Sequence, residues 1–374
     1  MEFSQYAWPM SAFTTGVAAW FAAMLLVLTT PLHGRFSAST LFNVQDAHTD
    51  PTPRIGGLAI YASVTLGILL TSGEARGILL SIVLAGTPAF AFGLLEDLTQ
   101  RVSVGSRLFA TLGSGVLGWF ITGITITDVN LPWIDALLLW PPLAVAFTAF
   151  AVSGVANAFN IIDGFNGLAA GTAMLVITAL GLLSLHLGDV QMANVCVLLA
   201  AAVFGFLLVN WPLGKIFLGD GGAYFVGFGV AWIAVAMLHR HPEVSAWCPL
   251  LICAYPVCEV VFSMLRRRKR ALHIGHPDRL HLHSLVKRRV VRQRFPTLHT
   301  RLRNSITGAM MWIMTLLPAL WAILFFDNTL MLALGLAVYA LSYEALYARL
   351  VWFRWSRPRS WPLPVPAPAS THPE

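Results

Sequence analysis

The chain has 374 residues, of which 57% are hydrophobic and only 11% are charged, and its formal net charge is +7. A soluble domain carries about a quarter charged residues, so this composition excludes an ordinary soluble protein. The excess of Lys and Arg is compatible with nucleic-acid binding, but in so apolar a chain it fits better with loops retained in the cytoplasm beside an anionic leaflet. The 4 cysteines form no CxxC pair, so the sequence indicates neither a disulfide framework nor a zinc ribbon.

Repeated apolar runs predict an all-α, polytopic membrane protein. A run of about 20 apolar residues is long enough to cross the hydrocarbon core of a bilayer as a helix. No Lys or Arg precedes the first run, so a cleaved signal peptide is not indicated. We expect about eleven transmembrane helices, at 9–31, 56–72, 76–94, 106–124, 132–155, 168–186, 192–209, 221–238, 247–265, 306–326 and 329–349.

The distribution of Lys and Arg predicts the orientation of these helices. With the N-terminus outside and the C-terminus cytoplasmic, only Arg76 and Arg240 of the 24 Lys and Arg residues lie outside, in agreement with the positive-inside rule. We therefore expect one polytopic membrane domain at 1–355 and a disordered, Pro-rich cytoplasmic tail at 356–374. Cytoplasmic loops that carry a site are expected at 33–55, 95–105, 156–167, 210–220 and 266–305.

This orientation places the acidic motif residues and most of the histidines on the cytoplasmic side, whereas the outside loops carry scattered charges without a motif. A transporter is expected to place polar groups near the bilayer midplane, in matched halves of the chain. Polar groups gathered at one interface favour an enzyme whose substrate has both a lipid part and a water-soluble part. The alternative, a membrane transporter or flippase of lipid-linked saccharides, is supported by two acidic residues within the spans, Glu259 and Glu344.

The most specific pattern is a polar stripe in which Asn157, Asn160, Asp163 and Asn166 recur at every third residue, followed by Gly167. A spacing of three keeps successive side chains on one slowly drifting stripe of a helix. Polar atoms at the end of a membrane helix are unfavourable unless a polar partner uses them. The stripe therefore predicts a binding site.

Three shorter motifs share the cytoplasmic side. Glu96 and Asp97 end the third span, where a solvated pair is the simpler interpretation, although partnered carboxylates can bind a divalent cation or act as a base. Asp220 lies in a Gly-rich turn that is typical turn chemistry and equally suits a hard oxygen ligand for Mg²⁺. Arg54, which precedes a Gly pair and a helix start, is a candidate phosphate ligand.

The long basic loop adds His281 and His283. Two histidines two residues apart are compatible with zinc, with His276 or Asp278 as further ligands. No Cys lies nearby, and Arg279 stands beside them among many Lys and Arg, so anion binding is the preferred interpretation.

Taken together, these motifs resemble those of the polyprenyl-phosphate N-acetylhexosamine-1-phosphate transferases, a family of the glycosyltransferase family 4 type. The resemblance runs from about Asp46 to His283, with five motifs in family order. Ser284 interrupts the run of histidines typical of phospho-N-acetylmuramoyl-pentapeptide transferase. The chain is therefore more similar to the undecaprenyl-phosphate N-acetylglucosamine-1-phosphate transferase branch.

The resemblance implies a Mg²⁺-dependent enzyme, with Mn²⁺ as an alternative cofactor, in a bacterial inner membrane with its active site facing the cytoplasm. Such an enzyme transfers an N-acetylhexosamine 1-phosphate from a UDP-sugar to undecaprenyl phosphate. It releases UMP and initiates a lipid-linked surface glycan such as O-antigen. The implied partners are a UDP-N-acetylhexosamine donor, a polyprenyl phosphate acceptor and membrane lipids, without nucleic acid, and a homodimer is allowed.

The resemblance also implies residue roles. Asp220 matches the metal ligand, Phe217 the aromatic that stacks on uracil, and Asn166 stands where the family has a second Asp. Glu96 and Glu259 keep the charge of a family Asp on a longer arm. The implied catalytic residues are Asp97, Glu96 and Asp163, and the implied substrate-binding residues are Thr52, Arg54, Asn157, Asn160, Asn166, Asn210, Phe217, Arg279, His281 and His283.

Overall fold

A computed structural model describes residues 7–37, 52–269 and 280–352, and the regular structure within those ranges is helical throughout. The expected tail at 356–374 and Arg279 lie outside the described residues. The described helices are, in chain order, α1 (Ala7–Leu28), α2 (Thr30–Ser37), α3 (Gly57–Leu69), α4 (Gly73–Thr99), α5 (Val104–Thr122), α6 (Pro132–Leu138), α7 (Pro141–Ile162), α8 (Leu168–His186), α9 (Val190–Asn210), α10 (Gly219–Arg240), α11 (Trp247–Ile252), α12 (Ala254–Lys269), α13 (Leu282–Val286), the π-helical segment η1 (Lys287–Val291), α14 (Arg292–Arg294), α15 (Thr300–Leu324) and α16 (Thr329–Trp352).

In the described part of the chain, 9 helices are long and apolar enough to cross a membrane, which makes this a multi-pass membrane protein. The sequence predicted about eleven. Helix α3 has only 13 residues, and two predicted spans are interrupted by proline. Pro141 begins a new helix after Trp140, and Pro256 cannot accommodate the Ile252 carbonyl four residues back, so the chain breaks at Cys253 between α11 and α12.

Several segments expected to be loops are helical. Helix α4 continues to Thr99 and α7 to Ile162, so the motifs there lie on or next to the last turns of helices. The range 266–305 holds the short helices α13, η1 and α14 and the start of α15. Helical ends fix the direction of a side chain more firmly than a loop does, and this matters for the site.

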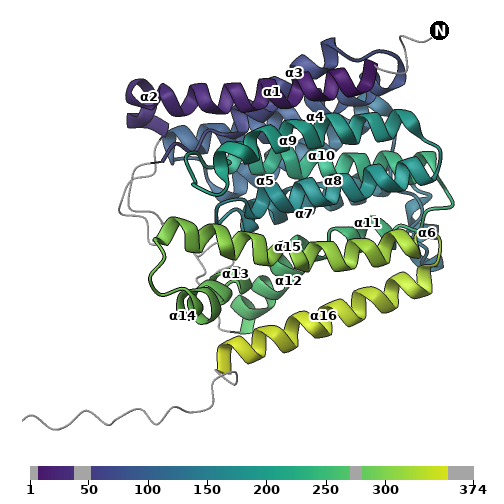
Figure 1. Cartoon of the computed structure of the whole chain (residues 1–374). Helices are drawn as coiled ribbons and strands as arrows, with labels where there is room; N and C mark the ends of the chain where they lie inside the picture. The colour runs from purple at the N-terminus through teal and green to yellow at the C-terminus, as the bar shows by residue number, and fades with distance from the viewer. Residues whose placement is uncertain (1–6, 38–51, 270–279, 353–374) are drawn as a thin grey trace, which may run out of the picture.

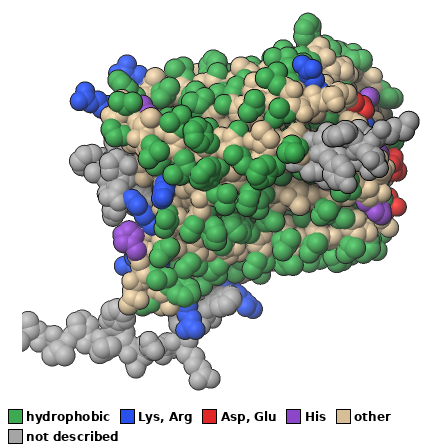
Figure 2. All heavy atoms as spheres, turned by 45° about the horizontal axis from the view of Figure 1, so that its top comes forward, with side chains coloured by type: hydrophobic (Ala, Val, Ile, Leu, Met, Phe, Trp, Pro, Cys, Tyr) green, Lys and Arg blue, Asp and Glu red, His purple; other side chains and the backbone are tan. Residues whose placement is uncertain are grey.

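The helices run side by side, so their ends gather at two ends of the bundle (Figure 1). Helices α2 and α14 mark one end, and α6 and α11 mark the other (Figure 1). The visible face between the ends is mostly hydrophobic, with Lys and Arg mainly at the α2 end and Asp and Glu at the other (Figure 2). Large exposed apolar side chains such as Phe109, Phe120 and Phe150 are expected on a surface that faces lipid.

Helix α10 lies at the centre and is the most buried of the candidate spans, in contact with α3, α4, α7 and α8. Glycine allows this close packing. A methyl group at Gly93 of α4 would lie 2.6 Å from the Gly221 Cα, and one at Gly57 of α3 would overlap Gly222. The end of α4 and the start of α3 are thereby held against the first turn of α10, which brings their flanking polar residues together.

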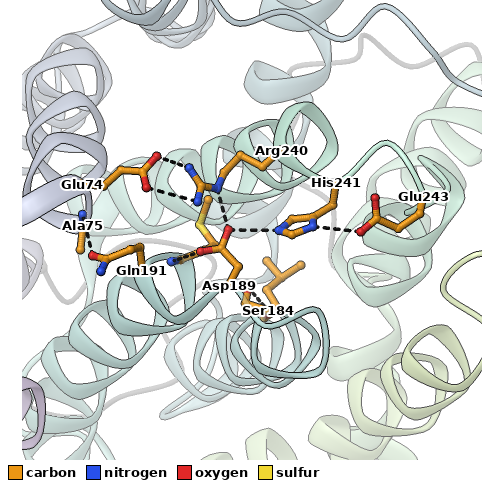
Figure 3. Close-up of polar contacts among 10 residues, drawn as sticks. Glu74, Ala75, Ser184, Asp189, Gln191, Arg240, His241 and Glu243 are labelled. Carbon is orange, nitrogen blue, oxygen red and sulfur yellow. Dashed lines mark hydrogen bonds and ion pairs between the residues drawn. The ribbon is translucent and has the colours of Figure 1, made fainter. Parts of the chain in front are cut away.

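A cluster of charged residues, which we call the distal cluster, lies at the other end of these helices (Figure 3). It consists of Glu74, Asp189, Arg240, His241 and Glu243. Arg240 ends α10 and donates both to Glu74 in the first turn of α4 and, at 2.6 Å, to Asp189 at the start of α9. The His241 ring lies 3.1 Å from Asp189 and 3.0 Å from Glu243. The distal cluster therefore fixes three helices to one another at the end away from the motifs.

Candidate active site

The first turn of α10 is capped by a side chain from another helix. Asp97, in the last turn of α4, is 3% exposed. Its Oδ1 accepts the Asp220 N–H and its Oδ2 accepts the Gly221 N–H, both at 2.9 Å. The first N–H groups of a helix have no partner within the helix and carry partial positive charge, so a buried carboxylate is stabilised there. Asp97 thus fixes where Asp220 lies.

Asp220 lies between two guanidinium groups. The Arg54 Nη2 is 3.6 Å from its Oδ1, and Arg107 of α5 donates to its Oδ2. Arg54 also approaches Asp97, with 3.9 Å between Nε and Oδ1. Arg107 was not among the predicted site residues, because an Arg in the first turn of a span has the ordinary role of marking the cytoplasmic end.

A third carboxylate, Asp163, follows α7 and faces the same turn. The Gly219 backbone donates a hydrogen bond to it, and the charges of Arg54 and Asp220 both act on it. Burial raises the pKa of Asp163 to about 7, with a further increase from Asp220, while Arg54 and the Gly219 hydrogen bond oppose the shift. We call Asp97, Asp163 and Asp220 the carboxylate cluster.

Gly219 makes this meeting of segments sterically feasible. Its φ is +77°, a conformation that favours glycine. A methyl group on it would overlap the Arg54 carbonyl oxygen and would lie 2.6 Å from the Asp97 Oδ2. The segment around Arg54 is held by the same turn, because Phe217 donates to the Pro53 carbonyl at 2.8 Å and accepts from Gly56 at 3.0 Å. The half-buried Phe217 and the buried Thr52 therefore lie beside Arg54 in the backbone pairing.

The first two residues of the polar stripe, Asn157 and Asn160, lie on α7. The Asn157 Nδ2 donates to the Ser153 carbonyl at 2.8 Å and to the Thr111 hydroxyl of α5 at 3.0 Å. The Asn160 Oδ1 accepts a long hydrogen bond of 3.4 Å from the Tyr224 hydroxyl of α10. These two amides join α7 to its neighbours next to the carboxylate cluster.

Asn166 and Asn210 hold the loop after the stripe. The Asn210 Oδ1 accepts the Gly167 N–H and its Nδ2 donates to the Ile216 carbonyl, both at 2.6 Å. Asn166 is fully buried, and its Nδ2 donates to the Ser305 hydroxyl at 3.1 Å and the Arg301 carbonyl at 3.3 Å in α15. Asn166 is thus directed toward α15, and its predicted contact with substrate stays a prediction.

The remaining predicted residues divide between the turn after α4 and the histidine segment. The Glu96 Oε2 accepts the Val102 N–H at 2.8 Å, which closes the turn between α4 and α5. His281 and His283 stack in parallel, with ring centroids 5.2 Å apart and an interplanar angle of 7°. The His283 ring meets Phe165 edge-on at 5.3 Å. Phe165 lies between Asp163 and Asn166 of the stripe, so the histidine segment borders the site on the Asp163 side.

The carboxylates suit a hard cation. Within the described ranges, no group of three or more His, Cys, Asp and Glu side chains is close enough to hold a metal ion alone. Mg²⁺ commonly takes one or two carboxylates and completes its shell with water and substrate phosphates. Asp220 and Asp163 offer only oxygen donors, and each raises the energy of the other's charge, which a divalent cation relieves. This pair therefore fits Mg²⁺ bound together with a phosphate ligand.

The sequence of this chain is similar to those of several known proteins. The model of glycosyl transferase family 4 matches residues 79–238. The chain is 32% identical over 288 residues to a decaprenyl-phosphate N-acetylglucosaminephosphotransferase of Mycolicibacterium smegmatis, with 67% of this chain and 68% of the relative covered. It is 28% identical over 254 residues to the undecaprenyl-phosphate alpha-N-acetylglucosaminyl 1-phosphate transferase of Escherichia coli K12, with 66% and 68% covered.

A third relative is a probable undecaprenyl-phosphate N-acetylglucosaminyl 1-phosphate transferase of Bacillus subtilis, 27% identical over 237 residues, with 63% of this chain and 66% of the relative covered. The chain thus spans about two thirds of the length of the relatives it matches. Its fold and site define a multi-pass membrane protein with buried carboxylates and guanidinium groups at one end. It belongs to glycosyl transferase family 4, among the polyprenyl-phosphate N-acetylhexosamine-1-phosphate transferases, as the sequence motifs predicted.

Proposed function

We propose that this protein transfers an N-acetylhexosamine 1-phosphate from a UDP-sugar to a polyprenyl phosphate such as undecaprenyl phosphate, with release of UMP. The observation that carries the proposal is the meeting of Arg54 and Arg107 with Asp97 and Asp220 at the start of α10. Cations next to oxygen ligands for Mg²⁺ are what a reaction between two phosphate groups requires. The relatives support the acceptor, because their names specify polyprenyl phosphates.

The reaction joins two anions, so repulsion between them has to be screened. In a single displacement, an oxygen of the lipid phosphate attacks the β-phosphorus of the donor. The bond from that phosphorus to the bridging oxygen breaks, and UMP leaves with the electron pair. A phosphate monoester loses its second proton near pH 6, so at neutral pH the acceptor needs no strong base. We assign to Arg54 and Arg107 the binding of phosphate oxygens.

The carboxylates have different roles in this scheme. Both Asp97 oxygens accept N–H groups of α10, which suits a residue that holds the site in place better than a nucleophile that must give up these bonds. Asp220 and Asp163 are the residues that would hold Mg²⁺, which supplies charge neutralisation of the transferred phosphate when bound. A trapped aspartyl phospho-sugar, or UMP release without acceptor, would contradict the single displacement.

The orientation and the pathway are part of the proposal. The positive-inside rule supports a cytoplasmic site in a bacterial inner membrane, and the half-buried Phe217 beside Arg54 is a candidate platform for the uracil ring. The donor is a UDP-N-acetylhexosamine, and the product begins a lipid-linked surface glycan such as O-antigen. The transporter alternative loses support, because Glu259 is bound to His281, Leu282 and Tyr343.

The test is UMP release by purified protein with undecaprenyl phosphate, Mg²⁺ and a panel of UDP-N-acetylhexosamines. We expect release with at least one donor, dependent on acceptor and Mg²⁺, and its loss in Asp220→Ala. Failure of every donor, or full activity in Asp220→Ala, would overturn the proposal. The panel also identifies the sugar.

A further inference from the structure

Glu259 of α12 is a fully buried carboxylate with three hydrogen-bond donors from two other segments. Its Oε1 lies 2.8 Å from the His281 Nδ1. The Leu282 N–H donates to the same oxygen at 3.2 Å. The Tyr343 hydroxyl of α16 donates to its Oε2 at 2.8 Å. A buried charge requires such donors, and here they join the histidine segment to the last described helix.

The carboxylate determines how the His281 ring is used. An ionised carboxylate only accepts hydrogen bonds, so the ring nitrogen that faces it, Nδ1, carries the proton. In a neutral imidazole the other nitrogen, Nε2, then has the lone pair, and the ring can bind through that atom. Carboxylates that hold a histidine in this way fix both its tautomer and its orientation.

His281 is connected to the site through its neighbour His283. Its ring stacks on His283, which meets Phe165, and a methyl group on Gly164 would lie 3.2 Å from the His283 Nε2. Gly164 follows Asp163 of the carboxylate cluster directly. Burial lowers the pKa of His283 to about 3, so this ring stays neutral beside His281. The histidine pair therefore lies next to the segment that carries Asp163.

We infer that Tyr343, through Glu259, is a positioning residue for His281, and that it determines which nitrogen of His281 faces the transferred phosphate. The inference rests on the proposed function and extends it to α16. Tyr343 lies outside the family-model match at 79–238, and none of the sequence motifs includes it. Glu259 loses one of its three donors when the hydroxyl is removed, which frees the carboxylate and with it the His281 ring.

The helix itself offers a matched control. Tyr339 lies about one turn before Tyr343, is also buried, and its hydroxyl has no hydrogen-bond partner in the described part of the chain. Tyr339→Phe and Tyr343→Phe therefore remove the same atom from the same helix, but only the second removes a bond to Glu259. We expect Tyr343→Phe to reduce kcat roughly 10- to 100-fold, as for other partners of an active-site ligand, and Tyr339→Phe to retain wild-type kcat.

A double-mutant cycle separates positioning from a general structural effect. With His281→Asn as the background, measured with radiolabelled donor, Tyr343→Phe should cause no further loss, because the residue through which it acts is gone. Glu259→Gln should reproduce the loss, and Glu259→Asp should restore part of it. Equal kcat in the two Tyr variants, or losses that simply multiply in the cycle, would overturn the inference.

A second measurement does not depend on turnover. Nitrogen-15 NMR of histidine-labelled protein distinguishes the Nδ1–H from the Nε2–H tautomer, and His281→Asn identifies the signal. We expect the Nδ1–H form in wild type and in Tyr339→Phe, and a mixture in Tyr343→Phe. If the wild type releases no UMP, the proposed function fails while this result still decides the role of Tyr343. An unchanged His281 signal in Tyr343→Phe would overturn the positioning role.

Discussion

The two ends of helices α4 and α10 both join carboxylates to arginines, but they do so differently. In the distal cluster, Arg240 donates at 2.6 Å to Asp189, and His241 lies within 3.1 Å of the same carboxylate. In the carboxylate cluster, Arg54 stands 3.6 Å and 3.9 Å from its two partners. In the distal cluster, Arg240 therefore donates directly to its carboxylate. At the site, Asp97 and Asp220 also have close donors, but Arg54 stands beyond hydrogen-bond distance of both carboxylates and keeps capacity for a phosphate ligand.

The pKa values of Asp189 and Asp163 differ in the same way. Burial favours a raised pKa at Asp189, but hydrogen bonds from Arg240, the Met192 N–H and His241 take this pKa below its ordinary value. At Asp163, burial and the neighbouring Asp220 prevail, and the pKa is about 7. A depressed carboxylate pKa marks a pair that stabilises the fold. A raised carboxylate pKa is typical of a functional site, where like charges are held close together.

The largest expected effect separates activity from stability. Asp220→Asn should lower the transfer rate about 10²- to 10³-fold with a smaller loss of stability than the distal variant, because relief of the repulsion from Asp163 partly offsets the weakened bond from Arg107. Asp189→Asn, its matched control, should leave the rate near wild type and lower stability by about 2 kcal/mol, since the hydrogen bonds from Arg240 and His241 lose their charged acceptor. UMP release and thermal unfolding in detergent measure both. Equal effects on the rate would remove the distinction between the two ends.

The two arginines provide the next test. Arg107→Gln should reduce transfer roughly 10- to 100-fold, mainly through kcat, because Asp220 loses its close donor and the phosphate loses a cation. Arg240→Gln should change only stability. Steady-state kinetics with varied donor and acceptor measures the first effect, and Arg107→Lys shows how far charge alone suffices. A normal kcat in Arg107→Gln would place this residue outside the site.

Restoring the family residue at Asn166 should reduce stability without raising activity. Asn166→Asp removes the donor to the Arg301 carbonyl and puts a charge in a fully buried position, which is unfavourable by about 1–3 kcal/mol. Glu96→Asp, the same kind of reversion at a partly exposed position, should have a smaller effect. Thermal unfolding and UMP release distinguish the two. Increased activity in Asn166→Asp would instead indicate that residue 166 takes part in metal binding.

Acid should weaken the site before the distal cluster. His283 keeps no proton in the folded protein down to about pH 3, whereas the unfolded chain binds one below its ordinary value of 6.5. Stability therefore falls as the pH drops from 6.5, by about 2 kcal/mol at pH 5. The Asp189 pKa is below its ordinary 3.8, so its contribution is lost only below about pH 4. Unfolding of wild type and His283→Asn between pH 7 and 4 checks this, because the variant should show a shallower decline.

The sequence predicted much of the site because the site follows helix ends. Asp97 and Asp220 each flank an apolar run in a short motif, and helix ends are where such runs stop. Arg107 was missed because its position equally suits a topology signal. The sequence did not predict a role for Tyr343, because its partner Glu259 is 84 residues away. A Tyr in an apolar helix usually serves only to pack against neighbouring side chains. The distal charges seemed scattered because α4, α9 and α10 bring them together only after packing.

Hydropathy alone did not predict where the helices break. A hydropathy window covers Trp140 and Cys253 without interruption, whereas proline after each of them prevents one continuous helix. The direction of Asn166 could not be predicted either, because its partners belong to α15, whose position depends on the whole bundle.

The turn at Gly219 has a consequence for how the protein is made. Arg54, Asp97 and the start of α10 meet at one point without room for a methyl group. The ribosome makes Asp97 more than a hundred residues before the N–H groups of Asp220 and Gly221 that later satisfy it. Until α10 is made, the Asp97 carboxylate has no N–H partners. A stalled product that ends before residue 219 is therefore expected to be a substrate for membrane quality control.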